Sequence, residues 1–441
     1  MHITPAKIIL LFFLITILTG TILLLLPISL AQPCNNKFID ALFTATSSVC
    51  VTGLTTVEIG TYYTLFGQII IMILIQIGGL GYMTLGSLLI LFTGKLTLKN
   101  KLVVHETAEI LSYENIIYFL KHVIKITVVV ELLGTIVLTL SFIQYPLMNK
   151  SILKSFYYGL FHSISAFNNS GLSLFNDSLI KFNQNIFVLI TMGILIIFGG
   201  IGYFVIIDLY RSRLRFNNCS LHTKIVLLTT AGLVVFGTFL IFVLENNNIQ
   251  TIGSQGTGYK LLNSFFTSVT PRTAGFNSLI MSNLMPSTIL LLMILMFIGA
   301  SPASTGGGIK TTTFAVLLKT FFSTIKGNQE INIYNRRLDL EAIKKSISIT
   351  TGFLFVVTFI CSLLLITEKQ TIVPVLFETV SAIGTVGLSL GITPYLSTIG
   401  KLLIILTMLV GRIGPLTIGI ALFQSDDNIE LKYPEEKIMV G

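Results

Sequence analysis

Long apolar runs separated by short polar segments dominate the chain. Eight of these runs carry few or no charged side chains, and most are long enough to cross a bilayer core of roughly 30 Å. They lie at about 8–30, 66–92, 123–143, 186–207, 225–244, 287–300, 347–366 and 402–423. The pattern predicts an all-α integral membrane protein with about eight spanning helices.

Composition and charge support this class. Of the 441 residues, 53% are hydrophobic and only 11% are charged, which excludes a soluble domain of this size. The net charge is +9, but the basic residues gather in alternate loops instead of forming one stripe, so they do not indicate nucleic-acid binding. These basic loops are 93–121, 210–224 and 319–345. The positive-inside rule places them, and therefore both termini, in the cytoplasm.

A twelve-residue pattern occurs four times between paired apolar runs. The copies are FTATSSVCVTGL (43–54), FHSISAFNNSGL (161–172), FFTSVTPRTAGF (265–276) and FETVSAIGTVGL (377–388). Each is too short to span a membrane, so we interpret them as re-entrant loops in four parallel helix–pore loop–helix repeats around a pseudo-fourfold central pore. The predicted repeats are 1–95, 96–215, 216–325 and 326–424, followed by a cytoplasmic tail at 425–441.

The end of each copy is predicted to form part of a cation filter. Extended backbone at membrane depth leaves carbonyl groups without partners, and a dehydrated cation about the size of potassium can satisfy a ring of them. Glycine tolerates the backbone angles that such a ring requires. The fourth copy contains the first three residues of the potassium-channel sequence TVGYG. The predicted filter residues are Val51, Thr52, Gly53, Asn169, Ser170, Gly171, Thr273, Ala274, Gly275, Thr385, Val386 and Gly387.

Glycine-rich segments also occur in the second apolar run of each repeat. We expect close helix packing at Gly78, Gly79, Gly81, Gly199, Gly200 and Gly202. The third segment, 299–310, differs because Pro302 and three consecutive glycines break the helix. The break is either a gate beneath the filter, with Lys310 as a cationic barrier, or only a structural interruption. The candidate gate residues are Ser304, Thr305, Gly306, Gly307, Gly308 and Lys310.

Three further charged residues lie in or near these segments. Arg412 lies about ten residues into an apolar helix, where a charge is costly without a polar partner. Below the filter it would repel cations and bond carbonyls of the 299–309 loop; the alternatives are a structural pair or a snorkelling side chain. Glu378 either adds negative potential near the pore entrance or bonds backbone behind the filter. Arg272 is expected to point away from the ion path and brace the third loop.

These residues resemble the Trk/Ktr/HKT superfamily of potassium transporters, and in particular its KtrB-type subunits. The resemblance covers nearly the whole chain and is carried by the four loops, the break at 299–310 and Arg412. It implies potassium uptake across the bacterial plasma membrane, often with sodium dependence, by a homodimer with one pore in each protomer. The 299–310 region would be the intramembrane gate, and Arg412 would be the arginine beneath the filter.

The same resemblance implies a cytosolic ring of nucleotide-binding regulatory subunits, of the KtrA type. ATP or ADP would bind this ring, so no organic cofactor is expected in the chain itself, and the basic loops are the natural docking faces.

The main alternative is a secondary carrier with alternating access, coupled to sodium or protons. It predicts midplane acidic residues and inverted repeats, and the sequence shows neither. The sequence also has no His, Cys or carboxylate cluster with catalytic spacing, so we do not expect an enzyme.

Overall fold

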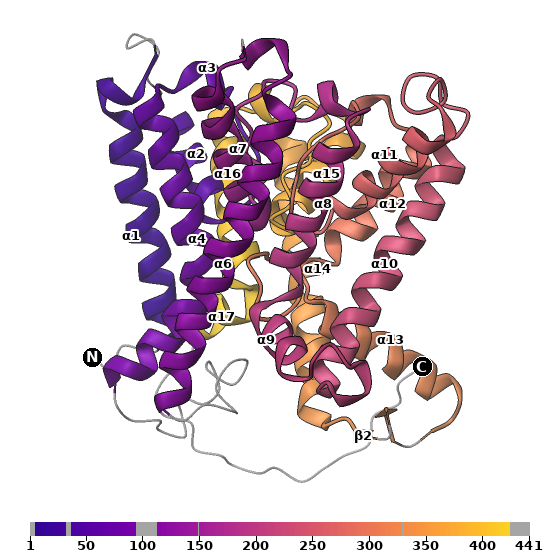
Figure 1. Ribbon diagram of the computed structural model, residues 1–441. Helices are drawn as coiled ribbons and strands as arrows, with labels where there is room; N and C mark the ends of the chain where they lie inside the picture. The colour runs from indigo at the N-terminus through magenta and orange to yellow at the C-terminus, as the bar shows by residue number, and fades with distance from the viewer. Residues whose placement is uncertain are drawn as a thin grey trace.

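The computed structural model describes residues 5–31, 37–93, 113–148, 150–328, 330–334 and 336–423. The described part is mainly helical, with one short hairpin of β1 (Asn332–Ile333) and β2 (Arg336–Arg337). Most helices run along one common direction (Figure 1). The predicted tail at 425–441, the two chain ends and most of the 93–121 basic loop lie outside the described residues.

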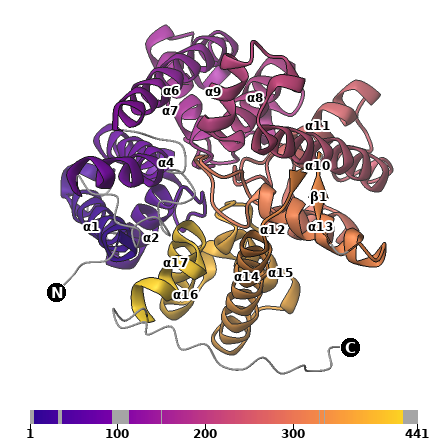
Figure 2. The same ribbon diagram turned by 90° about the horizontal axis from the view of Figure 1, so that it is seen from below.

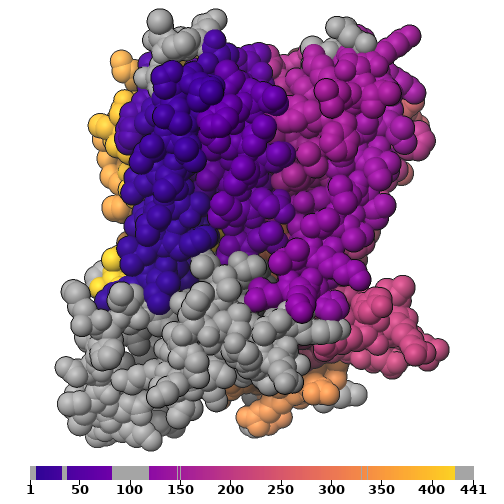
Figure 3. Space-filling model, turned by 60° about the vertical axis from the view of Figure 1, so that its left-hand side comes forward, coloured from indigo at the N-terminus to yellow at the C-terminus, as the bar shows by residue number. Residues whose placement is uncertain are grey.

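Four long apolar helices are candidate membrane spans. They are α1 (Pro5–Leu25), α6 (Tyr113–Phe142), α10 (Leu221–Glu245) and α14 (Leu340–Thr367). Between 20 and 28 residues of each qualify by length and hydropathy. Helix α1 extends along the outside of the molecule (Figure 3) and exposes Ile15, Leu18 and Ile22, each by more than half. Apolar surface of this kind is suited to lipid and not to water.

A half-length helix follows each long helix along the chain. These helices are α2 (Phe38–Val49), α7 (Ile152–Phe167), α11 (Thr257–Val269) and α15 (Ile372–Ile383). With 12–16 residues they are about 18–24 Å long, which is too short to cross a bilayer. All four lie in the upper half of Figure 1, and each ends just before one of the predicted filter segments.

The helix after each half-length helix returns through the molecule, and three of the four are interrupted. Helix α4 (Leu65–Thr93) is continuous, whereas α12 (Pro286–Phe297) and α13 (Thr311–Ile325) are separated by the predicted break. The other two returning helices bend sharply. Helices α8 (Ile186–Ile201) and α9 (Tyr203–Arg211) meet at 91°, and α16 (Thr398–Ile413) and α17 (Pro415–Phe423) meet with a bend of 95°.

The bends change the picture in two ways. The segments 186–207 and 402–423 each consist of two helices that meet at a sharp bend. By length and hydropathy, four described helices qualify as spans, or six if each bent pair counts once. The helix-packing role predicted for Gly202 is also wrong. Its φ of +91° is a conformation that glycine adopts without strain, and Gly414 has φ +94° at the second bend. The glycines therefore end α8 and α16.

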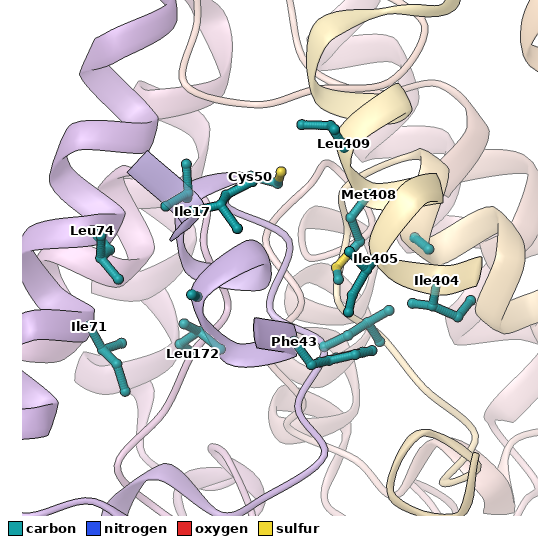
Figure 4. Packing of buried hydrophobic residues seen from close by; sticks show 14 of the residues in the cluster. Ile17, Phe43, Cys50, Ile71, Leu74, Leu172, Ile404, Ile405, Met408 and Leu409 are labelled. Atoms are coloured by element: carbon teal, nitrogen blue, oxygen red, sulfur yellow. The ribbon is translucent and has the colours of Figure 1, made fainter. Parts of the chain in front are cut away.

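The helices form four groups that follow one another around a centre in chain order (Figure 2). The last group closes against the first, because α16 packs on α2. Figure 4 shows part of the apolar cluster at this seam, where Phe43 of α2 faces Ile405 and Met408 of α16. Lys401 and Asp40 form a 2.7 Å ion pair across the same seam. One chain thus forms a closed circle of helices.

Candidate functional site

Each half-length helix leads into a short segment with unusual backbone angles. We call 51–53, 169–171, 273–275 and 385–387 the four glycine loops. The first residue of each has a positive φ, between 50° and 65°, at Val51, Asn169, Thr273 and Thr385. Val51, Thr273 and Thr385 are β-branched, and for such residues this region is an outlier that costs about 1–3 kcal/mol each, whereas asparagine tolerates it. The same conformation at four equivalent positions indicates that the surrounding structure imposes it.

The glycines of the four loops form a closed ring. Each has a positive φ, and a Cβ added to it would collide with a carbonyl oxygen of the next loop. The pairs are Gly53 with the Ser170 carbonyl, Gly171 with that of Ala274, Gly275 with that of Val386 and Gly387 with that of Thr52. The carbonyl groups just before the glycines are therefore gathered around one axis, and no side chain fits between them.

Hydroxyl side chains form hydrogen bonds with backbone groups in or next to each loop. Ser47 and Ser381 accept hydrogen bonds from the backbone N–H of Gly53 and Gly387, each at 3.0 Å. In the other two loops the hydroxyl donates instead. Ser165 Oγ donates to the Leu172 carbonyl and Thr270 Oγ1 to the Phe276 carbonyl, both at 2.7 Å. A hydroxyl in or directly after each half-length helix is thus bonded to the glycine loop or to the residue that follows it.

A buried polar cluster holds the second loop from behind. The Asn168 amide lies 2.9 Å from Gln76 Oε1 and 3.0 Å from Glu131 Oε1, to which it donates. Gln76 comes from α4 and Glu131 from α6, so the contact joins the first and second groups of helices. The Glu131 carboxylate is therefore engaged behind the loop.

Asn169, Arg272 and Glu378 make or lack further contacts around the second, third and fourth loops. Asn169 Nδ2 donates to the Arg272 carbonyl at 3.0 Å, so the backbone of Arg272 braces the second loop. The Arg272 side chain is buried, and its two terminal nitrogens make no hydrogen bond within the described part of the chain. Bracing of the third loop by this guanidinium, as expected from the sequence, is not found. Glu378 Oε1 accepts a hydrogen bond from the Thr393 side chain, and its Oε2 has no partner within the described residues, so neither role expected for Glu378 is decided.

Glycines in the returning helices accept the ends of the half-length helices. A Cβ on Gly78, Gly199 or Gly411 would collide with the carbonyl of Val49, Phe167 or Ile383, respectively. These carbonyls belong to the last turn of α2, α7 and α15, next to the glycine loops. The close packing predicted for Gly78 and Gly199 is present, and it sets the depth of the loops.

The 299–310 segment lies beneath the glycine loops and forms hydrogen bonds with the second and fourth groups of helices. Thr305 N donates to the Gly199 carbonyl, and Thr305 Oγ1 to the Phe167 carbonyl, both at 3.2 Å. Gly307 N donates to Thr385 Oγ1 at 3.0 Å. The segment is thus bonded both to the end of α7 and to the fourth glycine loop.

Other residues of this segment pack tightly or bond within it. A Cβ on Gly306 would collide with Thr273 Oγ1, and Gly308 has φ +70°. Ser304 Oγ donates to a carbonyl of the segment at 2.6 Å. Lys310 Nζ donates to the Gly306 carbonyl at 2.8 Å, so its ammonium group is engaged by the segment.

Arg412 connects the 299–310 segment to α4. The side chain is buried; Nη1 donates to the Thr305 carbonyl, and Nη2 donates to the Gly78 carbonyl at 2.6 Å. The bond to a carbonyl of the 299–309 loop is the one that the sequence predicted. The bond to Gly78 was not predicted, and it means that the guanidinium bridges two segments.

Several of these supports were missed from the sequence. The anchoring hydroxyls have a weak signal, because Ser47, Ser165 and Ser381 each lie four residues after the repeated phenylalanine. The third copy has valine there and uses Thr270, one residue later. The Asn168 cluster joins residues far apart in sequence and has no local signal.

A multi-pass membrane protein with four half-length helices and a ring of backbone carbonyls is the class that this fold and site define. The TrkH family of cation transport proteins matches residues 4–431. The chain belongs to this family, which confirms the superfamily resemblance and the expectation of a transporter instead of an enzyme.

Relatives extend the comparison over the whole chain. The Ktr system potassium uptake protein B of Bacillus subtilis (strain 168) is 40% identical over 439 residues, which is 99% of this chain and 97% of that protein. The protein of the same name in Vibrio alginolyticus is 39% identical over 437 residues, 99% of this chain and 94% of that one. The potassium/sodium uptake protein NtpJ of Enterococcus hirae is 36% identical over 451 residues, 100% of this chain and 98% of its own length.

The fold is also similar to a solved structure. The potassium transporter TrkH of Vibrio parahaemolyticus has a TM-score of 0.78 and 17% sequence identity, and the match covers 96% of this chain and 85% of that one. The all-α architecture is therefore confirmed.

Proposed function

We propose that the chain conducts potassium into the cell through the ring formed by the four glycine loops. The closed succession of carbonyl oxygens at Thr52, Ser170, Ala274 and Val386 carries this proposal. A ring of carbonyls replaces the hydration shell of a cation of suitable size. The relatives named for potassium uptake support the choice of ion, and NtpJ, named for potassium and sodium, supports a role for sodium.

Two side chains beside the ring support a cationic ligand. Thr52 Oγ1 and Ser170 Oγ are buried and have no hydrogen-bond partner within the described residues. A buried hydroxyl without a partner costs about 1–3 kcal/mol, and a cation passing the ring offsets this cost while it is bound. Within the described residues, no three His, Cys, Asp or Glu side chains gather as a metal-binding set, so the proposed ligands are mainly backbone oxygens.

The 299–310 segment is the proposed gate, with Arg412 as the side chain that holds it closed. The bonds of Thr305 and Gly307 to the glycine-loop region support this role, because they keep the segment beneath the ring. Release of the Arg412 bond to the Thr305 carbonyl frees one side of the segment. Lys310 adds positive charge at the same place.

The membrane topology and the subunit assembly are also part of the proposal. The four repeats end near 95, 215, 325 and 424, both termini are cytoplasmic, and two copies of the chain form a homodimer in the bacterial plasma membrane. A cytosolic nucleotide-binding ring docks on the basic loops and controls the gate. The name "Ktr system", carried by two relatives, supports a multi-subunit assembly.

Uptake of rubidium, with sodium as competitor, tests the filter. In cells without their own potassium transporters, we expect the chain to support saturable uptake that sodium inhibits weakly. Gly275→Ser introduces an atom against the Val386 carbonyl at a φ of +73° and should raise inhibition by sodium several-fold, with some loss of stability, so uptake is normalised to the folded protein in the membrane. Gly232→Ser, at an exposed helix position with nothing within 4 Å, is the matched control.

Unchanged selectivity in Gly275→Ser would contradict the filter. The alternative of a secondary carrier would then be favoured, and a carrier requires acidic side chains near the membrane midplane. Against it, the buried carboxylates of Glu131 and Glu378 accept hydrogen bonds from Asn168 and Thr393, which are not among the ring carbonyls, although Glu378 Oε2 has no partner within the described residues.

A further inference from the structure

The turn between α9 and α10 contains an open depression of about 440 Å³. It is lined by Asp208, Arg211, Ser212, Arg213, Arg215 and Asn218. Three of these six side chains are cationic, and the ion path described above does not use any of them. The depression is thus a separate candidate site for an anion.

The single acidic side chain of the depression is already satisfied. Asp208 Oδ2 accepts hydrogen bonds from Ser220 N at 3.0 Å, from Ser220 Oγ at 2.8 Å and from Thr223 Oγ1 at 2.5 Å. These donors belong to the beginning of α10, where Ser220 is the N-cap. Its carboxylate therefore fixes the turn to α10, and the depression keeps a net positive charge.

The backbone of the turn sets the spacing of the arginines. Arg213 and Leu214 have φ values of +51° and +60°, and Leu214 N donates to the Leu209 carbonyl at 2.9 Å. This tight reversal places alternate residues, Arg211, Arg213 and Arg215, around the same hollow. Guanidinium groups bind phosphate through paired N–H donors, which makes a phosphate group the ligand that fits best.

The position of the depression indicates where that phosphate comes from. Helix α10 is a candidate membrane span, and it begins at Leu221, three residues after Asn218. Helix α9 is turned by 91° from α8 and lies at the lower end of the molecule in Figure 1. The depression therefore lies at a membrane boundary, at the level of lipid headgroups.

Apolar side chains beside the arginines favour lipid over a soluble ligand. Tyr210 and Leu214 are each 78% exposed, and each is next to an arginine in the sequence 210–215. Large apolar residues next to cationic ones are typical of segments that lie in a membrane interface, with aromatic and aliphatic groups toward the acyl chains.

We propose that the depression binds the phosphate of an anionic phospholipid, with Arg213 and Arg215 at the headgroup and Tyr210 and Leu214 against the acyl chains. The bound lipid would hold α9 at the membrane surface. The lipid site goes beyond the proposed function. It lies in the basic loop 210–224, so the bound lipid and the proposed regulatory ring would contact neighbouring parts of the same loop.

Lipid titration of the purified full chain tests the proposal. Phosphatidylglycerol or phosphatidylcholine with identical acyl chains is added in detergent, and bound lipid is measured by native mass spectrometry and by the shift in thermal unfolding. The variant Arg213→Gln with Arg215→Gln should weaken phosphatidylglycerol binding on the order of tenfold, since each basic residue near a lipid surface contributes. Phosphatidylcholine binding should not change.

Two further variants keep the test interpretable. Arg336→Gln with Arg337→Gln removes the same charge from the exposed β2 strand and should leave phosphatidylglycerol binding unchanged. Tyr210→Ser with Leu214→Ser changes only exposed apolar groups and should also weaken lipid binding. The unfolding temperature without added lipid shows whether each variant is folded.

Three outcomes would overturn the proposal. The first is equal phosphatidylglycerol binding by wild type and by the Arg213/Arg215 variant. The second is full displacement of the lipid by inorganic phosphate, with no effect of the Tyr210/Leu214 variant, which would identify a soluble phosphate ligand. The third is unchanged lipid binding combined with lost docking of a regulatory subunit, which would identify a protein interface.

Discussion

Arg412 is the side chain with the most direct connection between the returning helices and the 299–310 segment. Its guanidinium bonds two carbonyl groups, those of Thr305 and Gly78, which belong to different parts of the chain. Two roles are consistent with this position: a positive charge that repels cations, or a clamp that holds the segment. The geometry of the side chain separates them, because arginine bonds two acceptors in a fixed fork and lysine does not.

Arg412→Lys and Arg412→Gln therefore give different results under the two roles. A clamp requires the fork, so we expect both variants to raise basal rubidium uptake several-fold in cells that express the chain alone. If charge repulsion dominates, Arg412→Lys should behave like wild type and only Arg412→Gln should raise uptake. Protein abundance in the membrane, measured for each variant, controls for loss of folding.

For individual residues, the sequence predicted which segments form the four loops, but it did not predict their backbone angles. The spacing from Phe43 to Gly53, repeated in the other copies, is enough to align the loops. The left-handed conformation of Val51, Thr273 and Thr385 has no such signal, since β-branched residues avoid it. Packing of the four loops against one another imposes these angles, and that packing is not encoded in any one loop.

Among the elements, the bent helices are the least predictable, and one of them contacts the 299–310 segment. Gly202 ends α8, and a Cβ there would lie 2.5 Å from the Pro302 carbonyl in the 299–310 segment. Tyr203 N donates to the Ala303 carbonyl at 2.9 Å at the same point. The bend therefore forms one wall of the segment. The apolar run 186–207 continues past Gly202 without interruption, so hydropathy alone does not locate the bend.

Gly202→Ala should disturb this wall. The new methyl group meets a backbone oxygen, and the φ of +91° is strained for alanine, so we expect a loss of stability of about 1–3 kcal/mol and altered basal uptake. Gly232→Ala, in the exposed part of α10, should be neutral or stabilise by up to about 1 kcal/mol. Thermal unfolding in detergent checks both, and equal unfolding temperatures would refute a special role for the bend.

For the whole molecule, the seam between the first and last groups of helices decides whether the circle is closed. Lys401 of α16 and Asp40 of α2 are bonded at 2.7 Å, and their side chains are only 12% and 9% exposed. The order of the four units follows from the repeated pattern, and the sequence predicted it. This contact between positions 361 residues apart has no local pattern, and only the structure locates it.

Removal of one member of this pair should be costly. Lys401→Met leaves the Asp40 carboxylate buried without its cation, which we expect to destabilise the protein by about 3–5 kcal/mol. The double variant Asp40→Asn with Lys401→Met should recover most of this loss. Lys181→Met, in the exposed pair with Asp177, is the control and should have little effect. Denaturant unfolding measures all three, and a Lys401→Met protein as stable as wild type would contradict the role of the seam.

The closed ring has a consequence for inheritance. Four identical subunits would repeat every substitution on all sides of such an opening. Here a single codon changes one side alone, so the opening can be modified one quadrant at a time. The four loops already differ from one another, with Val51-Thr52, Asn169-Ser170, Thr273-Ala274 and Thr385-Val386 before the shared glycine. If the ring is the proposed filter, substitutions would therefore change its ion preference one quadrant at a time.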